Sequence, residues 1–213
     1  MKIQNIPVGP IGTNCYIIYD EDSKTCAIVD PGFNAEKILN NIEKGYKATH
    51  ILITHPHYDH ISACEAVKLA TGAIVYIHEK AADILSNNDL NCTHTFTRRD
   101  PGKFTFDKTI KEGDIINIGT TPVKVLYTPG HCEGSCCFIA GDYIMSGDLL
   151  FLLNIGRTDF PTGDYNILQE SLKKLEALGK DYKILPGHGE ATTLKFEIEN
   201  NPYFGKVIYD FDY

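Results

Sequence analysis

The 213-residue chain has no C-x-x-C pair, and no apolar run in it approaches the length of a membrane span. A spanning helix needs about 20 predominantly apolar residues, and residues 1–14, MKIQNIPVGPIGTN, also lack the apolar core of a secretory signal. The seven cysteines are odd in number, which argues against a disulfide framework and, without C-x-x-C spacing, against a thiolate zinc knuckle. We therefore expect a cytoplasmic protein with no membrane partner.

Positive charge is scarce as well. Only 20 lysines and arginines stand against 28 aspartates and glutamates, which gives a formal net charge of −8. A surface that binds nucleic acid needs basic side chains to neutralise phosphates, so nucleic acid is not an expected partner. The apolar fraction of 43% and the charged fraction of 23% are ordinary for a globular protein. The length fits a single domain, 1–213.

Apolar runs that end at turn residues predict strands in both halves of the chain, and helical signals lie between them. Residues 86–105 show no period and are expected to form a long loop. Because strands and helices interleave, the pattern is typical of an α/β domain. The predicted strands are 2–8, 14–20, 25–32 with Pro31-Gly32 closing it, 48–54, 73–78, 114–119, 122–130, 135–140, 142–147 and 182–187. The predicted helices run from a cap at Asn34 to Gly45, over 60–72, from a cap at Asp164 to Gly179, and shortly after Gly189.

The stretch ITHPHYDHISA, residues 53–63, holds three histidines and an aspartate within six positions. His55, His57 and Asp59 are two residues apart, so an extended chain directs all three to one side. Asp59 and His60 are expected where the following helix begins, because its positive end favours a carboxylate. Imidazoles and a carboxylate are ligands for zinc, manganese or iron(II), so the stretch predicts a metal site. Solvated loop histidines are the alternative.

A metal ion takes four to six donors, so further ligands must come from elsewhere in the chain. His131 lies in TPGHCEGS, Asp148 in SGDLLF and His188 in LPGHGE, and each follows a predicted strand. We expect these three segments to converge on one edge of a sheet, beside the histidine-rich stretch.

Three other positions have two readings each. Asp30 either accepts a hydrogen bond from a ligand imidazole and fixes its tautomer, or serves as a turn residue before Pro31. Arg157 and Asp159 either shape the wall of a pocket or form an internal ion pair.

The long loop and one cysteine raise further alternatives. His94, Arg98 and Arg99 either cover a pocket and meet an anionic substrate, or are solvated. Cys132 follows a proposed ligand, and a thiol there would make the site sensitive to oxidation.

Together, THPHYDH, TPGHCEGS, SGDLLF and LPGHGE resemble the metallo-β-lactamase superfamily. NCYII, VDPG, GRTDFPTGD and the late E-x-x-x-NPYF are similar to the small, single-domain glyoxalase II-like, or hydroxyacylglutathione hydrolase-like, enzymes. The resemblance implies an α/β fold: a four-layer αββα sandwich of two mixed β-sheets flanked by helices.

The resemblance also implies two divalent metal ions, most simply zinc, with iron or manganese as alternatives. It implies that Asp148 bridges the ions and that Asp59 is also catalytic, orienting a hydroxide that the two ions generate from a shared water. The implied substrate is a small-molecule thioester, whose thiolate leaves with little proton assistance because thiols are acidic. The implied ligands are His55, His57 and His131 for the first ion and Asp59, His60 and His188 for the second.

Full-length glyoxalase II enzymes carry a further carboxy-terminal helical segment whose basic residues help to hold glutathione. This chain ends at Tyr213 soon after the last motif, so the resemblance implies hydrolysis of a small thioester without implying S-lactoylglutathione itself.

Two other functions fit the same residues. A mononuclear iron persulfide dioxygenase also carries GRTDF and would use His55, His57 or a neighbour, His131 and Asp148 around one Fe(II). A non-enzymatic metal-binding or interaction module would merely keep the scaffold. Nuclease and β-lactamase activities rank lower, because neither the length nor the charge supports an added nucleic-acid-binding region and a shared fold does not fix the substrate.

Overall fold

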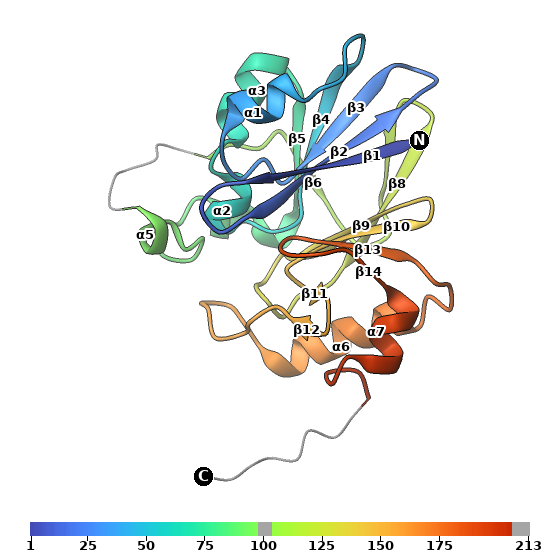
Figure 1. Ribbon diagram of the computed structural model, residues 1–213. Helices are drawn as coiled ribbons and strands as arrows, with labels where there is room; N and C mark the ends of the chain where they lie inside the picture. The colour runs from blue at the N-terminus through green and yellow to red at the C-terminus, as the bar shows by residue number, and fades with distance from the viewer. Residues whose placement is uncertain (98–103, 206–213) are drawn as a thin grey trace.

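The computed structural model of the protein describes residues 1–97 and 104–205, which form two six-stranded β-sheets stacked face to face (Figure 1). The first sheet has the order β1-β2-β3-β4-β5-β6. Its strands β1 to β3 are antiparallel, and β3 to β6 are parallel. The strands are β1 (Lys2–Val8), β2 (Thr13–Asp20), β3 (Thr25–Val29), β4 (Lys47–Ile53), β5 (Ile74–His78) and β6 (Lys108–Ile110).

The second sheet has the order β14-β13-β10-β9-β8-β7. Within it, β10 and β13 are parallel and the other neighbouring pairs are antiparallel, so both sheets are mixed. A small two-stranded hairpin follows β10. The strands are β7 (Ile115–Ile118), β8 (Thr121–Tyr127), β9 (Cys136–Ala140), β10 (Tyr143–Gly147), β13 (Lys183–Pro186) and β14 (Thr192–Thr193), with β11 (Leu150–Phe151) and β12 (Asn154–Ile155) in the hairpin.

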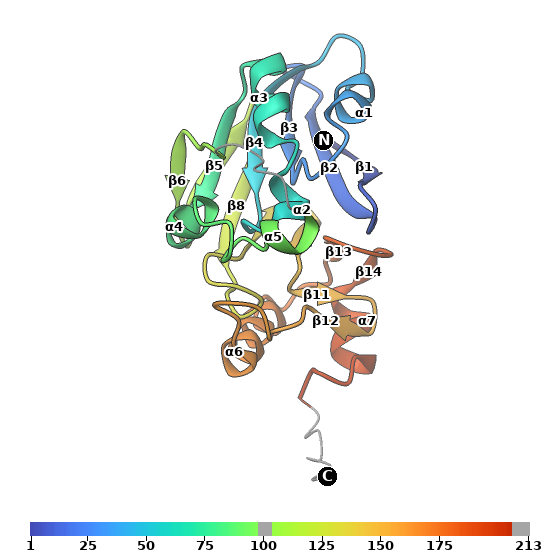
Figure 2. The ribbon, with the colours of Figure 1, turned by 90° about the vertical axis from the view of Figure 1, so that its left-hand side faces the viewer.

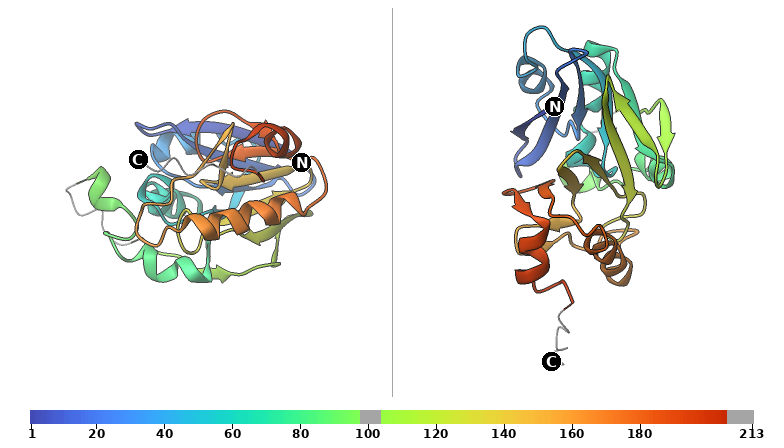
Figure 3. Two further views of the ribbon diagram at one scale, coloured as in Figure 1. Left: turned by 90° about the horizontal axis from the view of Figure 1, so that it is seen from below. Right: turned by 90° about the vertical axis from the view of Figure 1, so that its right-hand side faces the viewer.

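Helices cover the outer face of each sheet, α1 and α3 on the first and α6 and α7 on the second (Figures 1 and 3). This arrangement confirms the predicted four-layer αββα sandwich. The helices are α1 (Ala35–Asn40), α2 (Tyr58–Ile61), α3 (Cys64–Thr71), the 3₁₀ turn η1 (Glu79–Ala81), α4 (Ala82–Leu85), α5 (Thr93–Phe96), α6 (Tyr165–Glu176) and α7 (Leu194–Asn200). In the part of the chain that the structure describes, no helix combines the length and apolar character that crossing a membrane requires.

Strand β2 shows why the core has separate layers. All eight of its residues are buried. Ile17 and Tyr19 face the cluster beneath α1 and α3, whereas Tyr16 and Ile18 face the cluster between the two sheets, because successive side chains of a strand point to opposite faces. A third apolar cluster joins the second sheet to α6 and α7, where Leu168, Leu172 and Leu175 share one helix face.

Several local predictions are corrected by the structure. Asn34 lies at the start of α1 with a φ of 55° and makes no capping hydrogen bond; its Oδ1 instead accepts from the Gly9 N–H at 3.2 Å. The helix expected over 60–72 is divided into α2 and α3, and the expected loop 86–105 contains α5. The cap at Asp164 is confirmed, since its carboxylate accepts from the Ile167 N–H at 3.0 Å.

The strand directions bring one end of the sandwich together. Strands β8 and β10 are both antiparallel to β9, and β10 is parallel to β13, so the carboxyl ends of β8, β10 and β13 meet at one edge of the second sheet. Strand β4 of the facing sheet delivers the histidine-rich stretch to the same region, beside α2 (Figure 2). The expected convergence therefore involves both sheets.

Candidate metal centre

The structure gathers all seven predicted ligand side chains at this edge. His55, His57 and His131 form one compact group, and Asp59, His60 and His188 form another. Within each group, the atoms that could bind a metal lie within 4.8 Å of one another. Five of these six side chains are buried, and His188 is half-buried.

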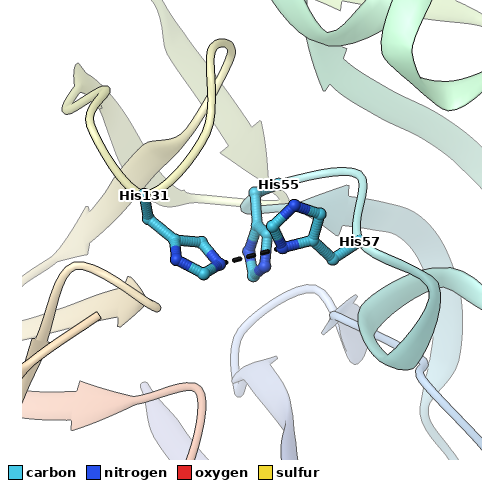
Figure 4. A group of neighbouring side chains, drawn as sticks. All are labelled: His55, His57 and His131. Atoms are coloured by element: carbon cyan, nitrogen blue, oxygen red, sulfur yellow. Dashed lines mark hydrogen bonds between the residues drawn. The ribbon is translucent and has the colours of Figure 1, made fainter. Parts of the chain in front are cut away.

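In the first group, the three imidazoles point toward one another from two loops (Figure 4). Nε2 of His131 lies 2.9 Å from Nδ1 of His57, and Nε2 of His55 is buried without a hydrogen-bond partner. Burial lowers the pKa of His55, lowers that of His57 to about 3, and lowers that of His131. The three rings are therefore neutral at pH 7, which is the form that binds metal.

A backbone carbonyl fixes the tautomer of His131. Its Nδ1–H donates to the carbonyl oxygen of Arg157 at 2.7 Å, so Nε2 carries the free lone pair and faces His57. Arg157 belongs to the GRTDF motif. That motif therefore supports the first group through its main chain.

In the second group, Oδ2 of Asp59 is the shared neighbour. It lies 3.2 Å from Nε2 of His60 and 3.1 Å from Nε2 of His188, and these two nitrogens are 3.3 Å apart. The Thr13 hydroxyl at the start of β2 donates to the same oxygen at 3.1 Å. Asp59 and His60 lie in the first turn of α2, directly after His57 at its N-cap, as the sequence predicted.

Asp148 lies between the two groups. Its Oδ2 is 3.7 Å from Nε2 of His131 and 3.5 Å from Nε2 of His188, and its Oδ1 is 3.4 Å from Nε2 of His60. Oδ1 is also buried without a hydrogen-bond partner. A buried, unpaired carboxylate oxygen is costly unless a cation meets it, so the position suits a bridging ligand.

Asp30 orients the candidate ligands through hydrogen bonds. One of its oxygens accepts from the Thr54 N–H at 2.8 Å, and the other accepts from the Thr54 hydroxyl at 2.6 Å and from Nδ1 of His60 at 2.9 Å. Nε2 of His60 is thereby directed at Asp59. Asp30, His55 and His60 also form a compact group, but the oxygens of Asp30 are already engaged, which supports the ligand-orienting reading.

The charges of the centre favour a cation. Burial alone would lower the pKa of His60, but Asp59, Asp148 and Asp30 outweigh it and raise that pKa well above its usual value. Burial alone would raise the pKa of Asp59 and of Asp148, yet the neighbouring histidines, His60 first, hold both below their usual range. The carboxylates stay ionised, so the donor set fits divalent metal ions.

A cavity of about 440 Å³ opens onto the centre. Arg157 lines it and forms two hydrogen bonds of 2.6 Å with Asp159. The pocket-wall reading therefore holds for Arg157, and the predicted ion pair forms, although it is exposed and not internal. The apolar lining residues are Ile11, Cys92, Phe96, Phe151, Ile155 and Phe160.

The structure also bears on the predictions for Cys132 and for the long loop. Cys132 is buried, and burial raises the pKa of its thiol to about 12, so it stays protonated and the expected sensitivity to oxidation is not supported. His94 is exposed and pairs with Asp89 at 2.7 Å, which agrees with the solvated reading. Arg98 and Arg99 lie outside the described residues.

Sequence reasoning missed four side chains of the centre. Thr13 and Thr54 bind Asp59 and Asp30 through their hydroxyls, and Phe151 and Phe160 line the cavity. A threonine hydroxyl or a phenylalanine carries no local signal of such a role. For Thr54, its position directly before His55 was the one available indication.

Comparisons with known proteins agree with this geometry. The family model of the metallo-β-lactamase superfamily matches residues 8–188. A probable metallo-hydrolase of Bacillus subtilis, YqgX, is 36% identical over 207 residues, which cover 95% of this chain and 97% of that protein. The hydroxyacylglutathione hydrolase GloC of Haemophilus influenzae is 35% identical over 208 residues, covering 95% and 98%.

Solved structures show the same fold. The B3 metallo-β-lactamase BLEG-1 matches with a TM-score of 0.89 and 35% identity, over 96% of this chain and 100% of that one. The di-iron-bound form of TTHA1623 matches with a TM-score of 0.83 and 31% identity, over 94% and 100%. The model match, the relatives and the His and Asp groups lead to one conclusion: the chain belongs to the metallo-β-lactamase superfamily, a superfamily of metallo-hydrolases that bind divalent metal ions.

Proposed function

We propose that the protein is a hydrolase of small thioesters that works with two divalent metal ions, most simply zinc. The observation that carries the proposal is the position of the Asp148 carboxylate, within 3.4–3.7 Å of histidines from both ligand groups. A centre for one ion would not need the second group. The likeness to the hydroxyacylglutathione hydrolase GloC supports the thioester as substrate.

Hydrolysis of a thioester adds water across the acyl C–S bond. A C–O bond forms at the acyl carbon, the C–S bond breaks, and the products are a carboxylate, a thiol and a proton. Two bound divalent ions would supply a nucleophile at neutral pH and stabilise negative charge on the acyl oxygen.

The side chains of this chain do the positioning. His55, His57 and His131 would hold one ion, Asp59, His60 and His188 the other, and Asp148 both. The contacts of Asp59 with Thr13, His60 and His188 all use Oδ2. Oδ1 is left to accept a hydrogen bond from the attacking water, which makes Asp59 the proposed catalytic residue. Apart from the candidate ligands, the residues that line the cavity are apolar except for Arg157 and Thr95.

The test combines elemental analysis with a substrate panel. Protein purified from unsupplemented medium should contain two divalent ions per chain and should cleave neutral thioesters, coenzyme A esters or S-lactoylglutathione. Asp59→Ala should abolish cleavage. Phe196→Ala, an exposed change on α7, should have no effect and serves as the control.

The rival functions predict other outcomes. A content of one iron per chain, together with oxygen uptake on glutathione persulfide, would favour a persulfide dioxygenase over the proposed hydrolase. Activities unchanged by Asp59→Ala would instead favour a non-enzymatic metal-binding or interaction module.

A further inference from the structure

Two phenylalanines flank the metal centre, one on the side of each ligand group. The ring of Phe160 lies 5.2 Å from the ring of His57 and 5.9 Å from that of His131, edge to face in both cases. The ring of Phe151 lies 6.2 Å from that of His188. Both phenylalanines line the 440 Å³ cavity, so a molecule that fills the cavity meets both rings.

Phe160 has a further contact besides the two histidines. The guanidinium of Arg157 lies 4.2 Å from the centre of the Phe160 ring. The cation and the two histidine rings all contact Phe160 and favour its position in the cavity wall. Phe151 is set by the β11–β12 hairpin, whose Ile155 also lines the cavity. An apolar wall selects by shape and apolar area.

The charge of Arg157 is already balanced. Asp159 accepts from Nε and Nη2 of the guanidinium, both at 2.6 Å. Among the lining residues that the structure describes, Arg157 is the one lysine or arginine. An anionic substrate would have to compete with Asp159 for it, whereas an uncharged group finds the apolar side chains without competition.

We propose that Phe160 and Phe151 are specificity-determining residues that select thioesters whose group beside the reacting C–S bond is apolar and uncharged. The proposal rests on the proposed thioester hydrolysis and names its substrate class. The apolar group lies either in the acyl half or in the thiol half of the thioester, because both halves adjoin the reacting C–S bond inside the cavity.

Two matched series distinguish the halves. One series keeps N-acetylcysteamine as the thiol and varies the acyl group from acetyl to phenylacetyl. The other keeps acetyl and varies the thiol from methanethiol to benzyl mercaptan and glutathione. In at least one series, the aryl compound should have a kcat/KM about tenfold or more above the small one. Phe160→Ala or Phe151→Ala should remove that gain, so that the ratio of kcat/KM for the aryl compound to that for the small one falls to about one, whereas Phe196→Ala should leave the ratio unchanged.

A charge variant gives an independent check. Asp159→Asn frees the Arg157 guanidinium, so it should raise the ratio of kcat/KM for the glutathione ester to that for the neutral esters about threefold or more. A wild-type preference for the glutathione ester, or equal losses on all substrates in the phenylalanine variants, would overturn the proposal.

A binding measurement separates this proposal from the proposed function. S-benzyl and S-methyl thioethers of N-acetylcysteamine cannot be hydrolysed, and calorimetry gives their Kd values. The benzyl compound should bind about tenfold more tightly, and Phe160→Ala should equalise the two. If no thioester is cleaved but this difference is found, thioester hydrolysis fails and the apolar selection stands. If thioesters are cleaved but the thioethers bind equally and neither substrate series shows a gain for the aryl compound, the selection fails alone.

Discussion

Asp30 accepts a hydrogen bond of 2.9 Å from Nδ1 of His60 while its own backbone is held at a φ of 51°. The same carboxylate accepts from the Thr54 N–H and hydroxyl, and the Thr54 hydroxyl lies 3.0 Å from Nδ1 of His55. One carboxylate therefore supports a histidine of each ligand group, directly for His60 and through Thr54 for His55.

Asp30→Asn should weaken binding of at least one ion about 10- to 100-fold, because the amide N–H₂ cannot accept from both the Thr54 hydroxyl and His60. Asparagine tolerates a positive φ, so the backbone should keep its conformation. Competition against a chromogenic chelator measures both affinities. Asp89→Asn, the same change at an exposed carboxylate, is the control. Unchanged affinities in Asp30→Asn would contradict the supporting role.

Gly187 lets the loop after β13 approach the centre. A Cβ there would lie 2.2 Å from Oδ1 of Asp148 and 2.8 Å from Cε1 of His60. Gly187→Ala should therefore displace the bridging carboxylate, reducing bound metal below two ions per chain and kcat/KM by tenfold or more. Gly189→Ala meets no atom within 4 Å but has a φ of 76°, so it should cost about 1 kcal/mol of stability and leave the metal content intact. Equal metal content in the two variants would argue against the steric explanation.

Much of the fold was predictable, because it follows from local patterns. Strand β1 was predicted to the residue, and Asp164 was correctly assigned as the cap of α6. The break between α2 and α3 was not predictable, since it depends on tertiary contacts such as the 3.0 Å hydrogen bond from the Ala63 N–H to the Pro31 carbonyl. Strands β11, β12 and β14 have two residues each, which is too short for a period to be visible.

The convergence of the candidate ligand side chains was predictable for a different reason. His55, His57, Asp59 and His60 are adjacent in sequence, and the other three candidates each follow a strong strand signal. Apart from the contact of Asp30 with a candidate ligand imidazole, the supporting contacts were not predictable, because they join residues far apart along the chain: Thr13 is 46 residues from Asp59. The phenylalanines that line the cavity were not predictable either, since no signal in the sequence indicates which phenylalanine faces a cavity.

Protonation of Asp20 should lower the stability of the folded protein in acid. The Ser23 hydroxyl, with the Ser23 N–H and the groups of Thr121 and Thr120, holds the pKa of Asp20 well below its usual range. A carboxylate whose pKa is lower in the folded state stabilises above its unfolded pKa of about 3.9, and that contribution is lost as the pH falls further. Asp20→Asn should lower Tm at pH 7 and flatten the fall in Tm between about pH 4 and pH 2. Thermal melts across that range measure it, and a parallel offset at every pH would exclude the linkage.

Glu197 should be required for stability, not for chemistry. It is fully buried, and its Oε1 accepts from the Thr192 hydroxyl at 2.6 Å while Oε2 accepts from the Leu153 N–H at 2.9 Å and the Asn201 amide at 2.8 Å. Glu197→Ala leaves these donors without an acceptor, so the free energy of unfolding should fall by about 3 kcal/mol.

Glu197→Gln is the matched variant that separates hydrogen bonding from charge. Its amide oxygen can take the position of Oε2 and keep the bonds from Leu153 and Asn201, and its N–H₂ can donate to the Thr192 hydroxyl, which also accepts. The loss should then be below about 1.5 kcal/mol. Urea denaturation with a chelator present measures both variants without the contribution of bound metal. If glutamine costs as much as alanine, the negative charge and not the hydrogen bonding is what the fold requires at this position.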